Sequence, residues 1–293
     1  MNKNNFNIIN FLKIYSEDKL ALFFLINLII ILGLVIFGPL ITLQNPYDLS
    51  QLNILDSLLP PLSQAYENNY FLLGTDDQGR DLLSAIIYGL RISLYVGILS
   101  VIISLIVGII LGVVSAYFGG FVDNFIMRVA DMVLAMPSFL IALVLLSILG
   151  RGLENVVFAL VMSQWATFAR VIRSSALSEK EKDYFYSARC LCLPQTRIIF
   201  GHLLPNCLPP IIVLSTINLA FAITLEASLS FLGVGLPITE PSIGLIISNG
   251  YEYIIVGKYW MSLYPGLFLL ITVVSINIFS DRLRILLNPR LNI

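Results

Sequence analysis

The stretch Ile92–Phe121, ISLYVGILSVIISLIVGIILGVVSAYFGGF, contains no charged residue. It is longer than the roughly 20 apolar residues that a helix needs to cross a bilayer. The whole chain has the same character, with 58% hydrophobic residues, 12% charged residues and a mean hydropathy of +0.90. A typical soluble domain has about 25% charged residues. We therefore expect an all-α protein embedded in a membrane.

Small residues recur at every fourth position of this stretch, which lets a second helix approach closely. The pattern indicates a helix packed inside a bundle and by itself says nothing about transport. The expected helix-packing stripe consists of Ser100, Ser104, Gly108, Gly112, Ala116 and Gly120.

Charged residues divide the rest of the chain, because an ionised side chain at the bilayer centre costs about 2.5 to 3.5 kcal/mol. One of the runs between them is short, so its span must use Arg170 or Glu154 at an end from which the side chain reaches water. We expect six transmembrane helices, at Leu20–Leu43, Ile92–Phe121, Met132–Gly150, Asn155–Ala169, Leu203–Leu225 and Met261–Ser280.

The Lys and Arg residues predict the orientation. If the N-terminus is inside, only Arg80, Arg91, Arg151 and Lys258 lie outside. This asymmetry places both termini in the cytoplasm. We divide the chain into residues 1–88 (N-terminal tail, first span and extracytoplasmic segment), 89–285 (five-helix core) and 286–293 (cytoplasmic tail).

The extracytoplasmic segment contains GTDDQGRDLLSAIIYGL. Thr75 as N-cap and Gln78 as its partner predict an amphipathic helix on the outer membrane surface. The alternative, a metal site at Asp76, Asp77 and Asp81, lacks a loop with ligand spacing.

The stretch Glu181–Asn206, EKDYFYSARCLCLPQTRIIFGHLLPN, is too polar to cross a bilayer and too aromatic for a linker. Ser178 and Glu181 form a capping box that predicts a helix over about 179–193, and Pro194 should start a second one. Aromatic residues flanked by Arg are typical of a contact with another protein. We therefore expect a docking surface on the cytoplasmic side.

The fifth span begins with a proline-rich break and carries two polar side chains, Asn218 and Glu226. An ionisable residue inside a membrane suggests a function, so both are candidates for a translocation path. The alternative is structural, because Glu226 lies near the outer end and can bond to a neighbouring helix.

The sequence lacks the residues that several kinds of catalytic or binding site require. There is no phosphate-binding G-x-x-x-x-G-K-[ST] loop, no nucleophile with a plausible base, and His202 is the only histidine. Cys190, Cys192 and Cys207 have spacings that zinc sites do not use, and no basic cluster indicates nucleic-acid binding. We expect a chain that catalyses no reaction and binds no metal or cofactor.

Several motifs taken together resemble those of a known family of membrane proteins. LGTDDQGRDLLSAIIYGLRISL, YFGGFVDNFIMRVADMVLAMPSFLIAL, EASLSFLGVGLP and the closing NPRL resemble the C-type membrane subunit of bacterial oligopeptide and dipeptide importers, which are ATP-binding cassette transporters. The resemblance covers nearly the whole chain. It implies a type I importer permease fold in the bacterial inner membrane.

The resemblance also implies that residues of about 179–203 form the family's coupling helix, which docks on an ATPase. Tyr186, Ser187 and Ala188 stand at the usual Glu-Ala-Ala, and Cys192 stands at a glycine that ends the helix in a left-handed conformation. Either Pro194 ends the helix differently or the turn is strained. The implied docking residues are Tyr184, Phe185, Tyr186, Ser187, Ala188, Arg189, Cys192, Leu204 and Pro205.

The implied partners are a homologous B-type permease subunit, two ATPase subunits that hold ATP and Mg, and an extracytoplasmic substrate-binding protein. Nickel, glutathione or antimicrobial peptides are alternative cargoes. An ion-coupled secondary transporter is a competing hypothesis, and it would need ionisable residues at the bilayer midplane. A third hypothesis is a scaffold that has lost transport through Cys192.

Overall fold

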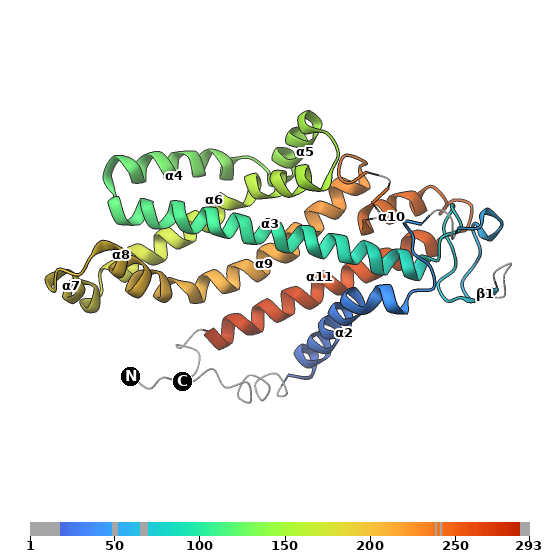
Figure 1. Ribbon diagram of the computed structural model, residues 1–293, viewed down its shortest axis with the longest axis horizontal. Coiled ribbons are helices and arrows are strands. Elements are labelled where there is room, and N and C mark those ends of the chain that lie inside the picture. The colour runs from blue at the N-terminus through green and yellow to red at the C-terminus, as the bar shows by residue number, and fades with distance from the viewer. Residues whose placement is uncertain (1–17, 49–51, 65–69, 238, 241, 288–293) are drawn as a thin grey trace.

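The computed structural model describes residues 18–48, 52–64, 70–237, 239–240 and 242–287. This part of the chain folds as a bundle of long helices that run roughly along its longest axis (Figure 1). Five of its helical segments are long and apolar enough to cross a membrane, which confirms the all-α membrane fold. They are α2 (Lys19–Ile41), α3 (Leu82–Phe118), α6 (Leu153–Lys180), α9 (Leu204–Phe231, extended back to Gln195 by two short elements) and α11 (Trp260–Leu287).

The third expected span is broken. Helix α4 (Gly120–Ala135) and helix α5 (Ser138–Leu149) meet at an angle of 90° and make a sixth span only if the pair counts as one. Pro137 lacks an N–H group and disfavours helical geometry at Met136, whose backbone is extended. The predicted continuous helix over Met132–Gly150 was therefore wrong.

The fourth expected span, Asn155–Ala169, was bounded by the charged residues on either side. Helix α6 is longer than this span and includes those charged residues. Arg173 forms a two-pronged ion pair with Asp123 of α4, at 2.5 Å from Nε to Oδ1 and 2.6 Å from Nη2 to Oδ2. Arg170 pairs with Asp131 of the same helix. The Arg173 pair is partly buried and offsets part of the cost of taking a guanidinium group into the bundle, whereas the Arg170 pair is exposed and contributes little.

The stripe of small residues lies in the contact between α3 and α6. A Cβ atom on Gly108 would come within 2.4 Å of Phe168 Cβ, and one on Gly112 within 2.6 Å of the Ala169 carbonyl oxygen. Ser100, Ser104 and Ala116 are buried. Gly120 is different: it begins α4 after a turn, is exposed, and a Cβ atom there would meet nothing within 4 Å, so its place in the stripe was wrong.

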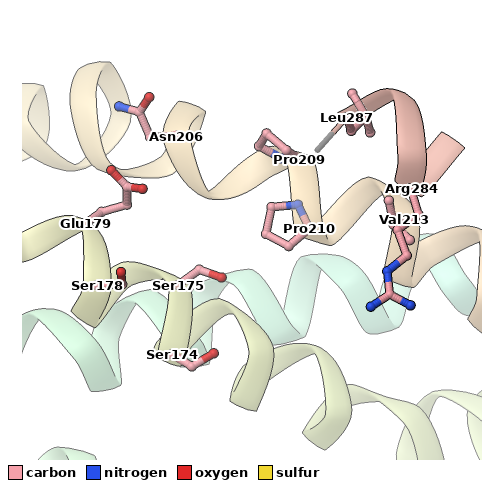
Figure 2. A pocket seen from close by; sticks show the side chains of 10 residues that line it. All are labelled: Ser174, Ser175, Ser178, Glu179, Asn206, Pro209, Pro210, Val213, Arg284 and Leu287. Carbon is pink, nitrogen blue, oxygen red and sulfur yellow. The ribbon is translucent and has the colours of Figure 1, made fainter. Parts of the chain in front are cut away.

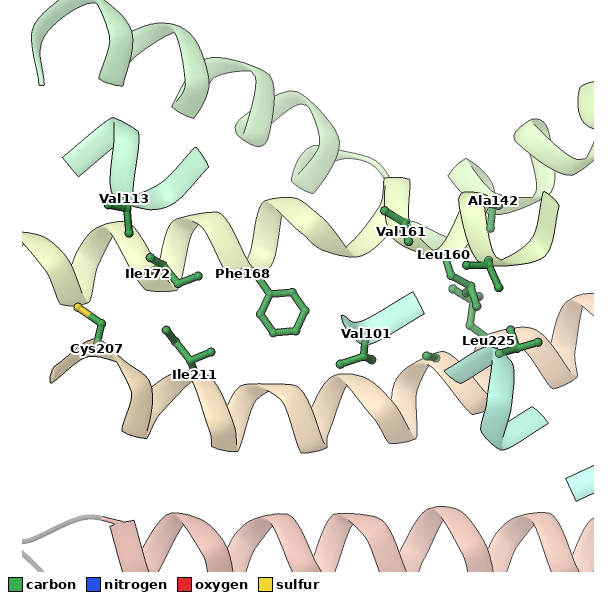
Figure 3. Packing of buried hydrophobic residues seen from close by; sticks show 14 of the residues in the cluster. Val101, Val113, Ala142, Leu160, Val161, Phe168, Ile172, Cys207, Ile211 and Leu225 are labelled. Atoms are coloured by element: carbon green, nitrogen blue, oxygen red, sulfur yellow. The ribbon is translucent and has the colours of Figure 1, made fainter. Parts of the chain in front are cut away.

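The largest buried cluster fills the space between α3, α6 and α9 (Figure 3). Phe168 lies at its centre, between Val101 of α3 and Ile211 of α9, and is fully buried. The cluster continues to Phe185 at one end of the bundle. The hydrophobic core therefore reaches from the membrane helices into the segment that follows α6.

The segment between α2 and α3 contains η2 (Ile54–Asp56) and a small antiparallel pair, β1 (Ser63–Gln64) and β2 (Tyr70–Phe71). Helix α3 begins at Leu82, where Asp81 is the N-cap and accepts a hydrogen bond from the Ser84 N–H at 2.9 Å.

The predicted N-cap at Thr75 and the separate surface helix were therefore wrong, because the Thr75 hydroxyl donates to the Asp56 carbonyl at 2.6 Å instead. Leu82, Ile86 and Leu90 are buried in the first turns of α3. Together with α10 (Ile243–Tyr251), this segment closes the bundle at the end opposite the segment that follows α6 (Figure 1).

Replacing Gly108 with Ala should lower the stability of the protein. The new methyl group would lie 2.4 Å from Phe168 Cβ and 3.0 Å from the Ala169 nitrogen, and overpacking of this kind costs about 1 to 3 kcal/mol. Thermal unfolding of the purified protein in detergent measures the effect. Gly266→Ala in α11 is the matched control, since a Cβ atom there meets nothing within 4 Å. Equal unfolding temperatures for the two variants would contradict the close contact.

Candidate functional site

Three short elements after α6 form the α7 tip, defined as residues Asp183–Leu203: α7 (Asp183–Cys190), α8 (Gln195–Ile198) and a π-helical turn, η3 (Ile199–Leu203). The tip projects from one end of the bundle (Figure 1). The capping box at Ser178 was wrong, because α6 continues to Lys180 and α7 begins after Lys182. The prediction that a second helix starts at Pro194 is confirmed, since Pro194 is the N-cap of α8.

The inner face of α7 is part of the hydrophobic core. Phe185 and Ala188, one helical turn apart, are both buried and belong to the same cluster as Leu203 and Cys207. These two predicted docking residues therefore hold α7 against the bundle instead of facing a partner. Leu204 is partly buried in the same region.

Tyr184 ties α7 to two other helices. Its hydroxyl donates to Glu179 Oε2 of α6 at 2.7 Å and accepts from Asn206 Nδ2 of α9 at 3.3 Å. Burial and then the bond to Glu179 raise the pKa of Tyr184 to about 12, so the hydroxyl remains a neutral donor near pH 7. Tyr184 positions the helix by these bonds.

The outer face of the tip is apolar and cationic. Tyr186 is 54% exposed, and Leu191 and Phe200 are 73% and 68% exposed. Leu191 and Phe200 were missed in the sequence, where nothing in their helical spacing set them apart from core residues. Of the predicted docking residues, the exposed ones are Tyr186, Ser187, Arg189, Cys192 and Pro205.

Cys192 ends α7 in a left-handed conformation with φ 50°. Its N–H donates to the Arg189 carbonyl at 2.9 Å, and the Leu193 N–H donates to the Ala188 carbonyl at 3.4 Å. This is the hydrogen-bond pattern of a helix C-terminus that glycine usually closes. The turn keeps the conformation of a glycine although a Cβ atom costs about 1 to 2 kcal/mol there.

The tip joins α9 through η3. The Leu204 N–H donates to the carbonyl of Ile199, five residues back, and Pro205 follows without an N–H group. The predicted break at these prolines was therefore wrong, because the helical backbone runs without interruption from Gln195 to Phe231 and Pro205, Pro209 and Pro210 lie within it.

The two candidates for a translocation path lie inside the bundle. Glu226 is fully buried, with hydrogen bonds from the Ser93 hydroxyl of α3 at 2.6 Å and the Ser230 hydroxyl at 2.8 Å. Asn218 is buried and its amide donates to the Leu214 carbonyl at 2.9 Å. Glu226 joins α9 to α3, and a role of either residue in a path stays a prediction.

The three cysteines lie in two different environments. Cys190 and Cys192 are exposed thiols on the tip, and Cys207 is buried under it. Within the described ranges, no group of three or more His, Cys, Asp or Glu side chains is arranged to hold a metal ion.

Comparisons with known proteins find relatives that align with nearly the whole chain. The chain is 36% identical to the dipeptide transport system permease protein DppC of Haemophilus influenzae, over 94% of this chain and 92% of the relative. It is 39% identical to DppC of Escherichia coli, over 94% and 91%. The oligopeptide transport system permease protein OppC of Bacillus subtilis is 33% identical, over 94% and 88%.

The fold has a solved counterpart. A chain of the MetNI methionine ABC transporter, in an inward-facing conformation, superposes with a TM-score of 0.57 at 18% identity, covering 71% of this chain and 98% of that chain. This likeness concerns the fold alone.

Two family descriptions match the sequence. Residues 10–61 match the N-terminal transmembrane domain of oligopeptide transport permease C, and residues 104–293 match the binding-protein-dependent transport system inner membrane component. The second match spans more than half of the chain and confirms the resemblance carried by the sequence motifs. The chain therefore belongs to the family of binding-protein-dependent transport system inner membrane components.

Proposed function

We propose that this chain is the membrane-spanning permease subunit of an ATP-driven importer for dipeptides and oligopeptides. The observation that carries the proposal is the identity of 33% to 39% to dipeptide and oligopeptide permeases across 94% of the chain. In this proposal the chain forms half of a translocation path in the bacterial inner membrane. A B-type permease subunit forms the other half, and a substrate-binding protein delivers peptides from outside.

The α7 tip docks on one of two ATPase subunits, which bind and hydrolyse ATP. Its outer face supports this role, because exposed aromatic and Arg side chains are typical anchors of protein interfaces. Its inner face supports transmission of force, because Phe185 and Ala188 are buried in the core that reaches α3 and α9. Movement of the ATPase then moves α7 as a rigid body together with the ends of α6 and α9.

The proposed orientation places the tip, and with it the N- and C-termini, in the cytoplasm. Helices α2 and α11 support this placement, because Asp18 before α2 pairs with Arg282 near the end of α11. Both helix ends point towards the end of the bundle that carries the tip (Figure 1).

Peptides are favoured over nickel, glutathione or antimicrobial peptides as cargo because the relatives named above are peptide permeases. The ion-coupled alternative has little support, since Glu226 is enclosed by serine hydroxyls and packed helices. Uptake of a radiolabelled dipeptide in cells that depend on this chain tests the proposal. Dipeptide uptake that is unchanged after deletion of the chain would refute it.

Replacing Tyr186 with Ala should weaken the association with the ATPase subunits by about 1 to 2 kcal/mol, as expected for an aromatic interface anchor. Arg189→Gln should act in the same direction. The measurement is the amount of ATPase subunit that co-purifies with the permease in detergent. Tyr251→Ala, which removes an exposed tyrosine at the opposite end of the bundle, is the matched control. Full co-purification of both tip variants would argue against docking through α7.

Replacing Cys192 with Gly should stabilise the tip. Glycine removes the steric strain of the left-handed conformation, which is about 1 to 2 kcal/mol. Glycine also increases the entropy of the unfolded chain, which cancels about half of this gain. Peptide uptake should be retained or increased, and the unfolding temperature should rise slightly. Cys190→Ser, within α7, controls for loss of a thiol. A drop in uptake in the glycine variant would show that the cysteine side chain itself is needed.

A further inference from the structure

A pocket of about 740 Å³ lies beside the α7 tip, where the ends of α6 and α11 face the start of α9. Its volume is within the range of about 300 to 1,000 Å³ that small-molecule sites occupy. Figure 2 shows its lining: serines of α6 along one wall, Pro209 and Pro210 of α9 along another, and charged groups near both ends.

One end of the pocket is rich in hydrogen-bond acceptors. Glu179 and Asn206 lie together there (Figure 2). The Glu179 carboxylate accepts from Tyr184 at 2.7 Å and from Lys182 at 2.5 Å, and Lys182 is an exposed side chain that can exchange for another cation. The side-chain oxygen of Asn206 accepts no hydrogen bond from the part of the chain that the structure describes.

Prolines add acceptors to the same stretch of α9. Pro209 and Pro210 have no N–H group, so the carbonyl oxygens of Pro205 and Asn206, four residues earlier, lack their usual helical partners. A carbonyl oxygen that loses its usual helical donor can accept a hydrogen bond from another N–H group, and of these two residues Asn206 lines the pocket. This end of the pocket therefore suits an ammonium group.

The opposite end carries a cation. Arg284 of α11 lines the pocket, and its side chain extends past Val213 at the end away from Glu179 (Figure 2). Among the described residues Arg284 has no ion-pair partner, whereas Arg282, two residues earlier, is paired with Asp18. A free guanidinium group binds a carboxylate through two parallel hydrogen bonds.

We propose that this pocket binds the zwitterionic main chain of a short peptide in transit, with its α-ammonium group at Glu179 and Asn206 and its α-carboxylate at Arg284. The proposal rests on the proposed function, because it needs peptide cargo and a cytoplasmic location of the α7 end. Ser175 lies between the two ends and Ser178 lies beside Glu179 (Figure 2), and both hydroxyls can donate to or accept from the peptide group.

The chemistry suits a carrier of varied peptides. All of the proposed bonds go to groups that every unmodified peptide has, and the pocket offers little that would select a particular side chain. Binding through one ion pair at each end is also weak enough for release into the cytoplasm. The site thus accounts for passage of many sequences through one path.

Protection of an introduced thiol tests the site in the complete transporter. Ser178→Cys places a thiol on the pocket wall, and its reaction with N-ethylmaleimide is followed by mass spectrometry at that position, which separates it from the native cysteines. Dialanine should slow the reaction. Dialaninamide, which lacks the carboxylate, and N-acetyl-dialanine, which lacks the ammonium group, should slow it much less.

In the Ser178→Cys protein, the additional substitution Arg284→Gln should raise the dialanine concentration needed for protection by about tenfold. This is the effect expected for the loss of one charge-assisted interaction. Arg284→Lys should raise this concentration less than Arg284→Gln does. Arg282→Gln, which removes a cation of the same helix outside the pocket, should leave protection unchanged.

Protection by dialaninamide equal to that by dialanine would overturn the site, and so would protection that Arg284→Gln leaves unaltered. A thiol at 178 that does not react at all would also overturn it, because a partner subunit would then fill the pocket. Dialanine uptake by cells with the unmodified chain is measured in parallel. Uptake without protection refutes the site alone, and absence of uptake refutes the proposed function.

Discussion

The close contact between α3 and α6 fixes the position of everything that follows α6. Phe168 and Ala169 pack directly on Gly108, because no side chain separates the two helices there. One to three turns further along α6, Arg173 reaches Asp123 at 2.5 Å and Lys180 donates to the Ala116 carbonyl at 2.6 Å. The Lys180 bond holds the end of α6 to the end of α3, and the Arg173 bond holds it to α4, which directly follows α3. The end of α6, and so the start of the α7 tip, is therefore set by glycines inside the bundle.

The sequence alone predicted the apolar helices well and their ends poorly. Uncharged runs identified each long helix, since hydrophobic thickness is a strong constraint. Charged residues, however, were taken as boundaries, whereas Arg170 and Arg173 lie within α6 and pair with Asp131 and Asp123 of α4. Ion pairs between residues 39 and 50 positions apart cannot be seen in a single sequence. The 90° bend after α4 was missed for a related reason, since a proline can end or only kink a helix.

Local capping motifs were the weakest guides. Thr75 with Gln78 and Ser178 with Glu181 both match a capping box, yet neither begins a helix. A cap contributes only about 1 kcal/mol, and the Thr75 hydroxyl bonds instead to the Asp56 carbonyl and the Leu59 N–H. The motifs of the resemblance were more informative. They located the α7 tip and the left-handed position at Cys192, but not which of its side chains face the core.

The structure links the tip to the pocket through one side chain. The Tyr184 hydroxyl bonds to Glu179 and to Asn206, and both of these residues line the pocket. Because Phe185 and Ala188 fix α7 to the same core, a displacement of α7 must either carry Glu179 and Asn206 with it or break their bonds to Tyr184. Either outcome changes the acceptor end of the pocket, where the ammonium group of a peptide is proposed to bind. A force applied to the outside of α7 therefore has a short physical route to the proposed peptide site, through the two hydrogen bonds of the Tyr184 hydroxyl.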